Sequence, residues 1–350
     1  MKSNIIASAA VLVEFNKIQI EELEVPSLGR GQVLVKVEYC GLCRSQLMEY
    51  RGFRGPDKWL PHLFGHEGYG TVLEIGEGVT KVSPGNNVVM GWIEGSGLSA
   101  PGPQYRRKDG STVNAGQIAA MSTHAVVSES RLTVAPAGLP PDVGVLFGCC
   151  LLTGAGIVMH ELDAPLDACI VLIGIGGVGL SALMTLVSLK YSNLIVIDAS
   201  QEKLEFARKL GVKATYLASD IEKSNSVLQH HGDIDFVIES AGRVETIELG
   251  FRLVRKFGGK VIFASHPPTG SLISIDPFDL ICGKEIRGSW GGSAKPDQDI
   301  PILFSLLTEA NMPLKSLIPK RYRLSEIELA LNDLELGKVF RPLIDLRSGA

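Results

Sequence analysis

The sequence predicts an α/β protein in which an all-β, barrel-like unit precedes a doubly wound parallel sheet. Its first half has short runs rich in Val and Ile, such as residues 33–37, 70–75 and 87–90, which Gly, Pro and Asn separate at close intervals. This pattern is typical of the strands of an all-β unit. From residue 169, apolar runs of about five residues alternate with helical segments, as expected for buried parallel strands joined by crossover helices.

Four buried strands and one apolar helix, over residues 180–189, are expected in this second half. The strands are residues 170–173, 194–197, 236–239 and 260–264. The segment 94–117 is dense in Gly, Ser, Pro and charged residues, and it is expected to be the longest loop.

Composition and charge narrow the class of function. A length of 350 residues corresponds to about two domains. The net charge of -4 and the scattered basic residues predict neither a nucleic-acid partner nor a membrane partner. Residues 1–10 do not have the pattern of a leader peptide, and no apolar stretch is long enough to span a bilayer. Six clustered cysteines do not suit a disulfide framework, which favours a cytoplasmic location.

A glycine-rich turn directly follows the expected strand 170–173. It reads Gly174-Ile175-Gly176-Gly177-Val178-Gly179. Such a turn between a strand and a helix is the fingerprint of dinucleotide binding: Gly174 permits the turn, Gly176 lets the backbone approach the pyrophosphate, and Gly179 allows close packing of helix on strand. Asp198 ends the next strand, where a carboxylate accepts hydrogen bonds from a ribose and repels a 2'-phosphate. The sequence therefore predicts NAD rather than NADP.

Cys43, His66 and Cys149 supply two thiols and one imidazole for a metal ion. This donor set leaves one tetrahedral position open, as in a catalytic zinc site. Buried Cys and core His are the commoner fates of such residue types, so the donors alone do not decide the matter. Cys150 is an alternative to Cys149. A redox function for the pair Cys40 and Cys43 is disfavoured, because the surrounding pattern is not that of a thioredoxin-type unit.

Three segments occur in order along the chain. They are Cys-Gly-Leu-Cys-Arg-Ser at 40–45, Gly-His-Glu-Gly-Tyr-Gly at 65–70 and Gly-Cys-Cys-Leu-Leu-Thr-Gly at 148–154. Together with the glycine-rich turn they resemble the zinc-dependent medium-chain alcohol dehydrogenase family. The resemblance extends over nearly the whole chain. It implies a GroES-like β-barrel catalytic domain of residues 1–150 and 290–350, and a Rossmann NAD-binding domain of residues 151–289. It also implies a homodimer, with a tetramer left open.

The resemblance also implies roles for individual residues. Cys43, His66 and Cys149 would hold one catalytic zinc, which would polarise the hydroxyl of a small alcohol or ketone substrate. Ser45 would take up the proton of the substrate hydroxyl, and Glu67 would either tune the metal or serve only as a buried hydrogen-bonding partner. The cofactor contacts would be the pyrophosphate-binding Arg44 and Arg341, the nicotinamide-packing Thr153, and the ribose-binding Lys203.

The chain departs from the family pattern at several places. Gln46 stands where the family often has an Asp that orients the ligand His, and Met48 stands where some members have a His that ends the proton relay. No Cys lies between residues 90 and 125, which predicts one zinc per chain and no structural zinc. In the family, a position near Trp92 lines the substrate pocket. The charged segment that holds Arg106, Arg107 and Lys108 neighbours the active site in the family.

The sequence thus predicts a zinc-dependent oxidoreductase that transfers a hydride between a secondary alcohol and NAD. A polyol, cyclitol or amino sugar is suggested only by the charged segment 94–117. Two alternatives remain at this point. One is a zinc-free reductase of the quinone or enone type with the same fold, and the other is a non-catalytic, NAD-binding regulatory protein.

Overall fold

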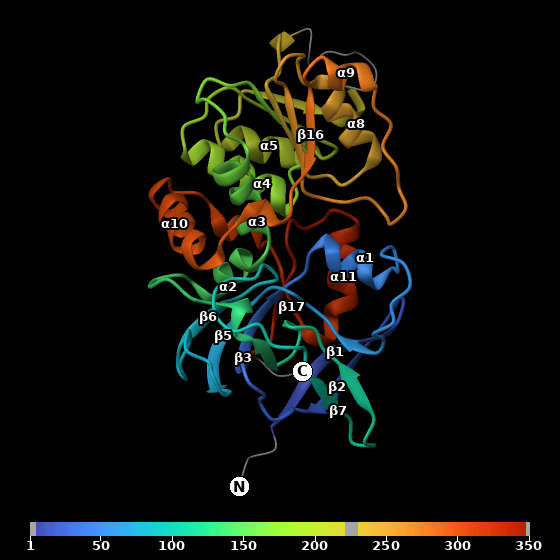
Figure 1. Cartoon of the computed structure of the whole chain (residues 1–350), viewed down its shortest axis with the longest axis vertical. Coiled ribbons are helices and arrows are strands. Elements are labelled where there is room, and N and C mark those ends of the chain that lie inside the picture. The colour runs from blue at the N-terminus through green and yellow to red at the C-terminus, as the bar shows by residue number, and fades with distance from the viewer. Residues whose placement is uncertain (1–4, 221–229, 348–350) are drawn as a thin grey trace. The chain divides into compact units, whose positions relative to one another are not determined.

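A computed structural model describes residues 5–220 and 230–347 of the chain. The chain forms two compact units. Unit 1 comprises Met1–Cys149, Lys295–Phe304 and Pro313–Ala350, and unit 2 comprises Cys150–Ala294 and Ser305–Met312. Figure 1 shows the elements in chain order by colour.

Five strands of unit 1 close into a barrel in the order β1-β2-β7-β8-β4. They are β1 (Ile6–Glu14), β2 (Lys17–Glu24), β4 (His62–Leu63), β7 (Gln104–Arg106) and β8 (Thr112–Asn114). The inward-facing side chains form a small apolar core that includes Val11, Leu23, Tyr105 and Val113. The barrel expected from the first half of the sequence is therefore present.

The expectation that the segment 94–117 is a long loop is wrong in part, because the segment contains the hairpin of β7 and β8. The central residue of each strand, Tyr105 or Val113, is fully buried, and its neighbours in the strand point outward. Strands of three residues carry too little period-2 signal to be recognised in a polar sequence. Beyond β7, Arg107 pairs with Glu21 on β2 (Nε to Oε2, 2.5 Å).

A second sheet of unit 1 has the order β10-β6-β5-β3-β18-β17, and β9 also pairs with β3. Its strands are β3 (Gln32–Gly41), β5 (Gly68–Ile75), β6 (Asn87–Met90), β9 (His124–Ser128), β10 (Leu132–Val134), β17 (Arg321–Arg323) and β18 (Leu343–Asp345). The expected strands 33–37, 70–75 and 87–90 lie in β3, β5 and β6. The pairing of β18 with β3 returns the end of the chain to unit 1.

Short helices complete unit 1. They are α1 (Arg44–Tyr50), η1 (Glu129–Arg131), α2 (Pro141–Gly144), η2 (Val145–Gly148), η5 (Leu314–Leu317), η6 (Leu324–Glu326) and α11 (Ile327–Glu335). α11 buries Ile327, Ala330 and Leu331 in the same apolar core as β3 and β5. The residues of α10 (Pro296–Glu309) are divided between the two units.

Unit 2 is built on a six-stranded sheet in the order β13-β12-β11-β14-β15-β16, in which every neighbouring pair is parallel. The strands are β11 (Ile170–Ile173), β12 (Leu194–Asp198), β13 (Ala214–Leu217), β14 (Phe236–Glu239), β15 (Lys260–Phe263) and β16 (Glu285–Gly288). The chain order reverses between β11 and β14, which is the point where Rossmann-type sheets bind dinucleotides. The doubly wound sheet predicted from the sequence is confirmed.

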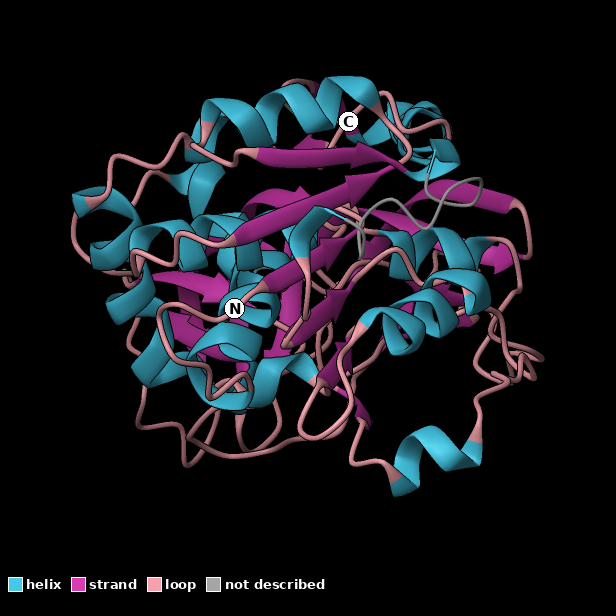
Figure 2. Ribbon diagram, turned by 90° about the horizontal axis from the view of Figure 1, so that it is seen from above, coloured by secondary structure: helices cyan, strands magenta, loops and turns pink. Residues whose placement is uncertain are grey.

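Unit 2 also contains helices among its described residues, and some of them pack on this sheet. They are α3 (Cys150–Gly156), η3 (Ile157–Glu161), α4 (Gly177–Ser188), α5 (Gln201–Lys209), α8 (Val244–Leu253), α9 (Pro277–Ile281) and η4 (Gly291–Ser293). α5 packs on β12 and β13, and α8 packs on β14 and β15 (Figure 2). Because the central strands are buried on both faces, each reads in the sequence as an unbroken apolar run.

Within the described ranges, no single helix has the length and apolar composition to cross a bilayer. The bent pair Pro141–Gly148 and Cys150–Glu161 meets these criteria only when its two helices are taken together.

Candidate functional site

The register of three strands brings the predicted metal donors together at one edge of the second sheet of unit 1. Cys40 on β3 is paired with Gly68 on β5, and Gly68 is paired with Met90 on β6. Cys43 lies two residues after the end of β3 and His66 lies two residues before β5, so both lie beside this row. Gly148 packs so closely on Met90 that a Cβ would overlap the Met90 carbonyl oxygen. This contact sets Cys149 at the same edge.

The donor atoms of Cys43, His66 and Cys149 all lie within 4.8 Å of one another. Cys43 Sγ is 3.3 Å from His66 Nε2, and each of the two thiols is 8 % exposed. Cys150, the sequence alternative, is fully buried at the start of α3 and is not part of this group. Cys40 is also fully buried, and its thiol contacts the Gly41 carbonyl.

The electrostatics of the two thiols favour a cation. Burial opposes ionisation of Cys43. The hydrogen bond with Cys149, together with the charge and hydrogen bond of His66, nevertheless holds the pKa of Cys43 well below its usual range. Hydrogen bonding to Cys43, together with burial, raises the pKa of Cys149 well above its usual range. The surroundings thus favour the thiolate at Cys43 and the thiol at Cys149. A dication bound by both sulfurs would displace the thiol proton, because metal ligation requires thiolates.

Gln46 contacts both His66 and the backbone of a metal donor. Its Oε1 accepts a hydrogen bond from the Cys43 N–H at 2.9 Å, and its Nε2 contacts His66 Nδ1. An imidazole that ligates through Nε2 carries its proton on Nδ1 and needs an acceptor there. A rotated amide would offer its oxygen to His66 but would turn its NH₂ group toward the Cys43 N–H. The amide can therefore satisfy only one of these two donors, whereas a carboxylate would satisfy both.

We expect Gln46→Glu to bind zinc about 10- to 100-fold more tightly than the wild type, because a carboxylate of equal length accepts from both N–H groups and raises the basicity of His66. Competition with a chromophoric chelator measures this affinity. Gln117→Glu, a change of the same kind at a residue outside the donor group, serves as the control. An unchanged or weaker affinity of Gln46→Glu would contradict this account of the amide.

Glu67 and Arg341 form a buried ion pair beside the metal donors. Arg341 Nη1 is 3.2 Å from Glu67 Oε1 and also donates to the Leu42 carbonyl at 3.2 Å. Burial raises the pKa of Glu67 to about 7, although the Arg341 guanidinium lowers it. Gly41 is required here, since a Cβ would lie 2.6 Å from Glu67 Oε1. The pyrophosphate-binding role of Arg341 stays a prediction, as does that of Arg44, which is exposed at the start of α1.

Ser45 lies in the first turn of α1, and its hydroxyl oxygen accepts a hydrogen bond from Arg54 Nη2. Arg54 could not be recognised from the sequence, because nothing in the local pattern shows that residues nine apart meet. Met48, at the relay position, is buried and apolar.

The glycine-rich turn of unit 2 has the geometry that its fingerprint predicts. Gly174 has φ +80°, and a Cβ on it would lie 2.8 Å from Ala241. A Cβ on Gly179 would overlap the Gly174 carbonyl oxygen, so this glycine lets α4 approach β11. A Cβ on Gly176 would have no atom within 4 Å, which leaves space beside the N-terminus of α4. The turn thus offers backbone N–H groups to an anion.

Two buried carboxylates stand beside this turn. Asp198 Oδ2 accepts from the Ile175 N–H at 2.8 Å, which ties the end of β12 to the turn. Glu239 ends β14, and its Oε1 accepts from the backbone N–H groups of Ala241 and Gly242 at 2.9 Å each. Glu239 was missed in the sequence, where an acid that ends an apolar run was its only signal.

The remaining predicted cofactor residues of unit 2 lie on α3 and α5. Thr153 is buried, and its hydroxyl has no hydrogen-bond partner among the described residues. Lys203 is half-buried in the first turn of α5, where its N–H is near the Ser200 hydroxyl at 3.4 Å.

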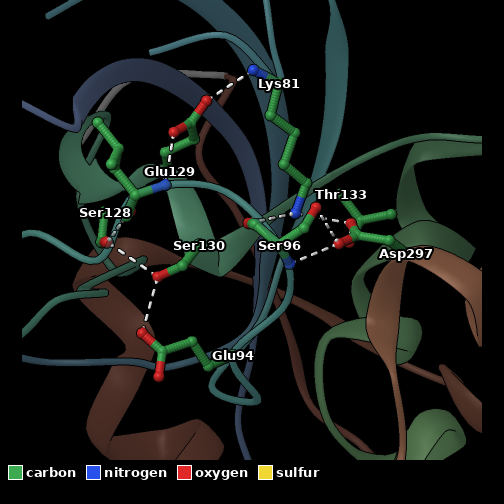
Figure 3. Close-up of polar contacts among 9 residues, drawn as sticks. Lys81, Glu94, Ser96, Ser128, Glu129, Ser130, Thr133 and Asp297 are labelled. Atoms are coloured by element: carbon green, nitrogen blue, oxygen red, sulfur yellow. Dashed lines mark hydrogen bonds and ion pairs between the residues drawn. The ribbon is translucent and has the colours of Figure 1, made fainter. Parts of the chain in front are cut away.

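A network of polar contacts holds Trp92 and the residues that follow it. This segment contains no cysteine that could bind a structural zinc. The Trp92 carbonyl accepts from Arg131, and the buried Glu129 accepts backbone N–H groups of Thr80, Lys81 and Leu98 at 2.6 Å each. Figure 3 shows Glu129 and its surroundings together with Asp297, which accepts from Ser96. The structure thus shows what fixes this segment, whereas the number of zinc ions per chain stays a prediction.

Comparison with known proteins places both parts of the chain. Residues 29–137 match the alcohol dehydrogenase GroES-like domain, and residues 177–309 match the zinc-binding dehydrogenase domain. The chain is 24 % identical to alcohol dehydrogenase class-3 of Cereibacter sphaeroides over 373 aligned positions, which cover 96 % of this chain and 98 % of that protein.

Solved structures show the same fold. The benzyl alcohol dehydrogenase of Acinetobacter calcoaceticus superimposes with a TM-score of 0.86 at 26 % identity, with 97 % of this chain and 99 % of that chain covered. An alcohol dehydrogenase zinc-binding domain protein of Burkholderia ambifaria reaches a TM-score of 0.89 at 24 % identity, with 98 % and 100 % covered. With these matches and a Cys-His-Cys donor group, the chain belongs to the zinc-containing medium-chain alcohol dehydrogenase family and is an alcohol dehydrogenase-type oxidoreductase.

Proposed function

We propose that this enzyme oxidises a secondary alcohol, or reduces the corresponding ketone, with NAD as the hydride carrier and one zinc held by Cys43, His66 and Cys149. The observation that carries the proposal is the convergence of two thiols and an imidazole on one point, with a fourth tetrahedral position left for a substrate oxygen. A zinc bound there supplies a Lewis acid that favours ionisation of the substrate hydroxyl.

Ser45 is the residue proposed to take up the substrate proton. Its Oγ accepts a hydrogen bond from the Arg54 guanidinium. A hydrogen bond from a cation stabilises negative charge that develops on an oxygen. Arg54 would therefore make the Ser45 hydroxyl a better proton donor to the next group in a relay. Because Met48 cannot accept a proton, that next group is water or the cofactor ribose.

Two features of unit 2 fit a dinucleotide. The open space at Gly176 lies where a pyrophosphate would approach the first N–H groups of α4. The buried Thr153 hydroxyl lacks a partner among the described residues, and it would gain one from a nicotinamide. Asp198 carries the preference for NAD, since its charge would oppose a 2'-phosphate.

Asp198→Asn should reduce the preference for NAD over NADP by about 10-fold, which corresponds to ~1.4 kcal/mol, because the repelling charge is removed while the shape is kept. The measurement is the ratio of kcat/KM for the two cofactors, or of their dissociation constants. Glu202→Gln, which removes an exposed charge nearby on α5, should leave the ratio unchanged. An unchanged ratio in Asp198→Asn would mean that this carboxylate does not face the ribose.

The direct test of the proposed function joins metal analysis to a substrate screen. Purified enzyme is assayed for zinc by mass spectrometry and for NADH formation with secondary alcohols, beginning with polyols, cyclitols and amino sugars. The screen also includes apolar secondary alcohols, because Arg107 pairs with Glu21 and Lys108 with Glu22, which offsets two of the charges that suggested a polar substrate. Zinc-free protein that reduces quinones or enones would favour the first alternative, and NAD binding without any turnover would favour the second.

An exposed apolar edge of unit 2 supports the proposed homodimer. Among the described residues, β16 pairs with β15 alone and lies at the end of the sheet. Next to it in sequence, α9 has no buried residue, and Phe278 and Ile281 are 59 % and 80 % exposed. Pairing of two such edges around a two-fold axis would cover these side chains and satisfy the free strand.

Ile281→Asp should therefore shift the protein toward monomers, because a charge would be buried at the proposed interface. Sedimentation velocity measures the change. Leu166→Asp, at a side chain in unit 2 that is 57 % exposed, is the matched control and should keep the wild-type state. A dimer that tolerates Ile281→Asp would exclude this face.

A further inference from the structure

A second group of metal-ligating side chains lies in unit 1, apart from the cysteines. It consists of Glu49 on α1, Asp57 in the segment after α1, and His62 on β4, and their ligand atoms all lie within 4.8 Å of one another. His62 Nε2 is 2.9 Å from Asp57 Oδ2 and 3.7 Å from Glu49 Oε1. The alcohol dehydrogenase function proposed above uses none of the three.

The orientation of His62 fixes which of its nitrogens faces the acids. Its Nδ1 donates to the Leu63 carbonyl at 2.8 Å, so the proton of the neutral ring is on Nδ1. Nε2 then has only a lone pair, and this lone pair is directed at carboxylate oxygens. Two acceptors at 2.9 Å repel each other unless a cation or a proton lies between them. A backbone carbonyl that holds Nδ1 is also the usual partner of a metal-ligating histidine.

The surroundings favour a dication over a single proton. The His62 side chain is only 10 % exposed, and those of Asp57 and Glu49 are 18 % and 24 % exposed. Arg54 is a nearby cation that acts on Glu49, and Asp57 and Glu49 together place two carboxylates around the one imidazole of His62. Asp57 is also held in place, because its Oδ1 accepts from the Trp59 N–H at 2.8 Å and leaves Oδ2 for a ligand.

We propose that Glu49, Asp57 and His62 bind a divalent transition-metal ion at a second site. One imidazole and two carboxylates form a donor set suited to Zn²⁺ or Mn²⁺. The ion links α1, β4 and the segment between them, and so anchors the helix whose first turn carries Ser45 and Gln46. Because this site has no thiolate, it exchanges its metal more readily than the cysteine site.

The test is a titration of the EDTA-dialysed full-length enzyme with Mn²⁺, in which loss of the free-ion EPR signal counts bound ions. We expect one bound Mn²⁺ per chain and a higher Tm in its presence. Thiolate sites bind Mn²⁺ poorly relative to zinc, so the cysteine site does not interfere. Cys43→Ala should keep Mn²⁺ binding, and this result separates the second site from the proposed dehydrogenase centre.

Asp57→Asn and Glu49→Gln should each weaken Mn²⁺ binding by at least about 10-fold, since even changes beyond the direct ligands cost about 10- to 100-fold. Asp109→Asn, at an acid on the β7–β8 turn, is the control and should bind as the wild type does. Circular dichroism checks that the variants fold. A wild type that binds no Mn²⁺, or an Asp57→Asn variant that binds it equally well, would overturn the proposal and assign a proton to the position between His62 and Asp57.

Discussion

Cys43→Ala is expected to abolish zinc binding and to lower kcat/KM on the order of 10³-fold. Loss of one thiolate leaves two donors, which is too few for a stable catalytic zinc site. A metal that acts as a Lewis acid contributes several kcal/mol to transition-state stabilisation, and each 1.36 kcal/mol is about tenfold in rate. Zinc content by mass spectrometry and initial rates with NAD measure both effects in the same preparation.

The adjacent cysteines provide the control for this experiment. Cys150→Ala removes a fully buried thiol one residue from Cys149, outside the donor group. It should keep about one zinc per chain, whereas Cys149→Ala should lose it as Cys43→Ala does. Cys43 Sγ also accepts from the Ser45 N–H at 3.3 Å and caps α1. Cys43→Ala is therefore compared with the wild type by thermal unfolding, and retention of zinc by a folded variant would refute the assignment.

Long apolar runs of the sequence predicted the strands of unit 2 that lie beside the glycine-rich turn. β11, β12 and β14 were recognised because strands buried on both faces leave no polar interruption. The return of the chain through β18 was expected only from the family resemblance. That pairing joins residues such as Cys40 and Ile344, and no local pattern reports a contact over such a distance in sequence.

The residues of the candidate site also differ in whether the sequence could reveal them. Cys43, His66 and Cys149 were identifiable because metal ligation demands particular residue types. Arg54 and Glu239 were not, because their importance lies in contacts that only the fold creates. Gln46 is an intermediate case. Its position beside His66 was expected from the sequence. Its amide also faces the Cys43 N–H, and this second contact depends on the geometry of α1.

Gly179→Ala is expected to eliminate measurable NAD binding and to lower the Tm. A Cβ at this position would overlap the Gly174 carbonyl oxygen, which is backbone and cannot turn aside, and would lie against the Ser240 hydroxyl. The first turn of α4 must then move away from β11, and the N–H groups that would meet the pyrophosphate move with it. Tryptophan or NADH fluorescence measures binding, and calorimetry measures the Tm.

Gly176→Ala separates the two consequences of this change. Its Cβ would meet no atom within 4 Å, and its φ of -70° suits any residue, so the fold should keep its Tm. NAD binding should still weaken by about 10-fold or more, because the added methyl group occupies the space through which the pyrophosphate approaches the backbone. If Gly176→Ala bound NAD as the wild type does, the dinucleotide would not lie on this turn. If Gly179→Ala kept both its Tm and its affinity, close packing of α4 on β11 would not be what the glycine provides.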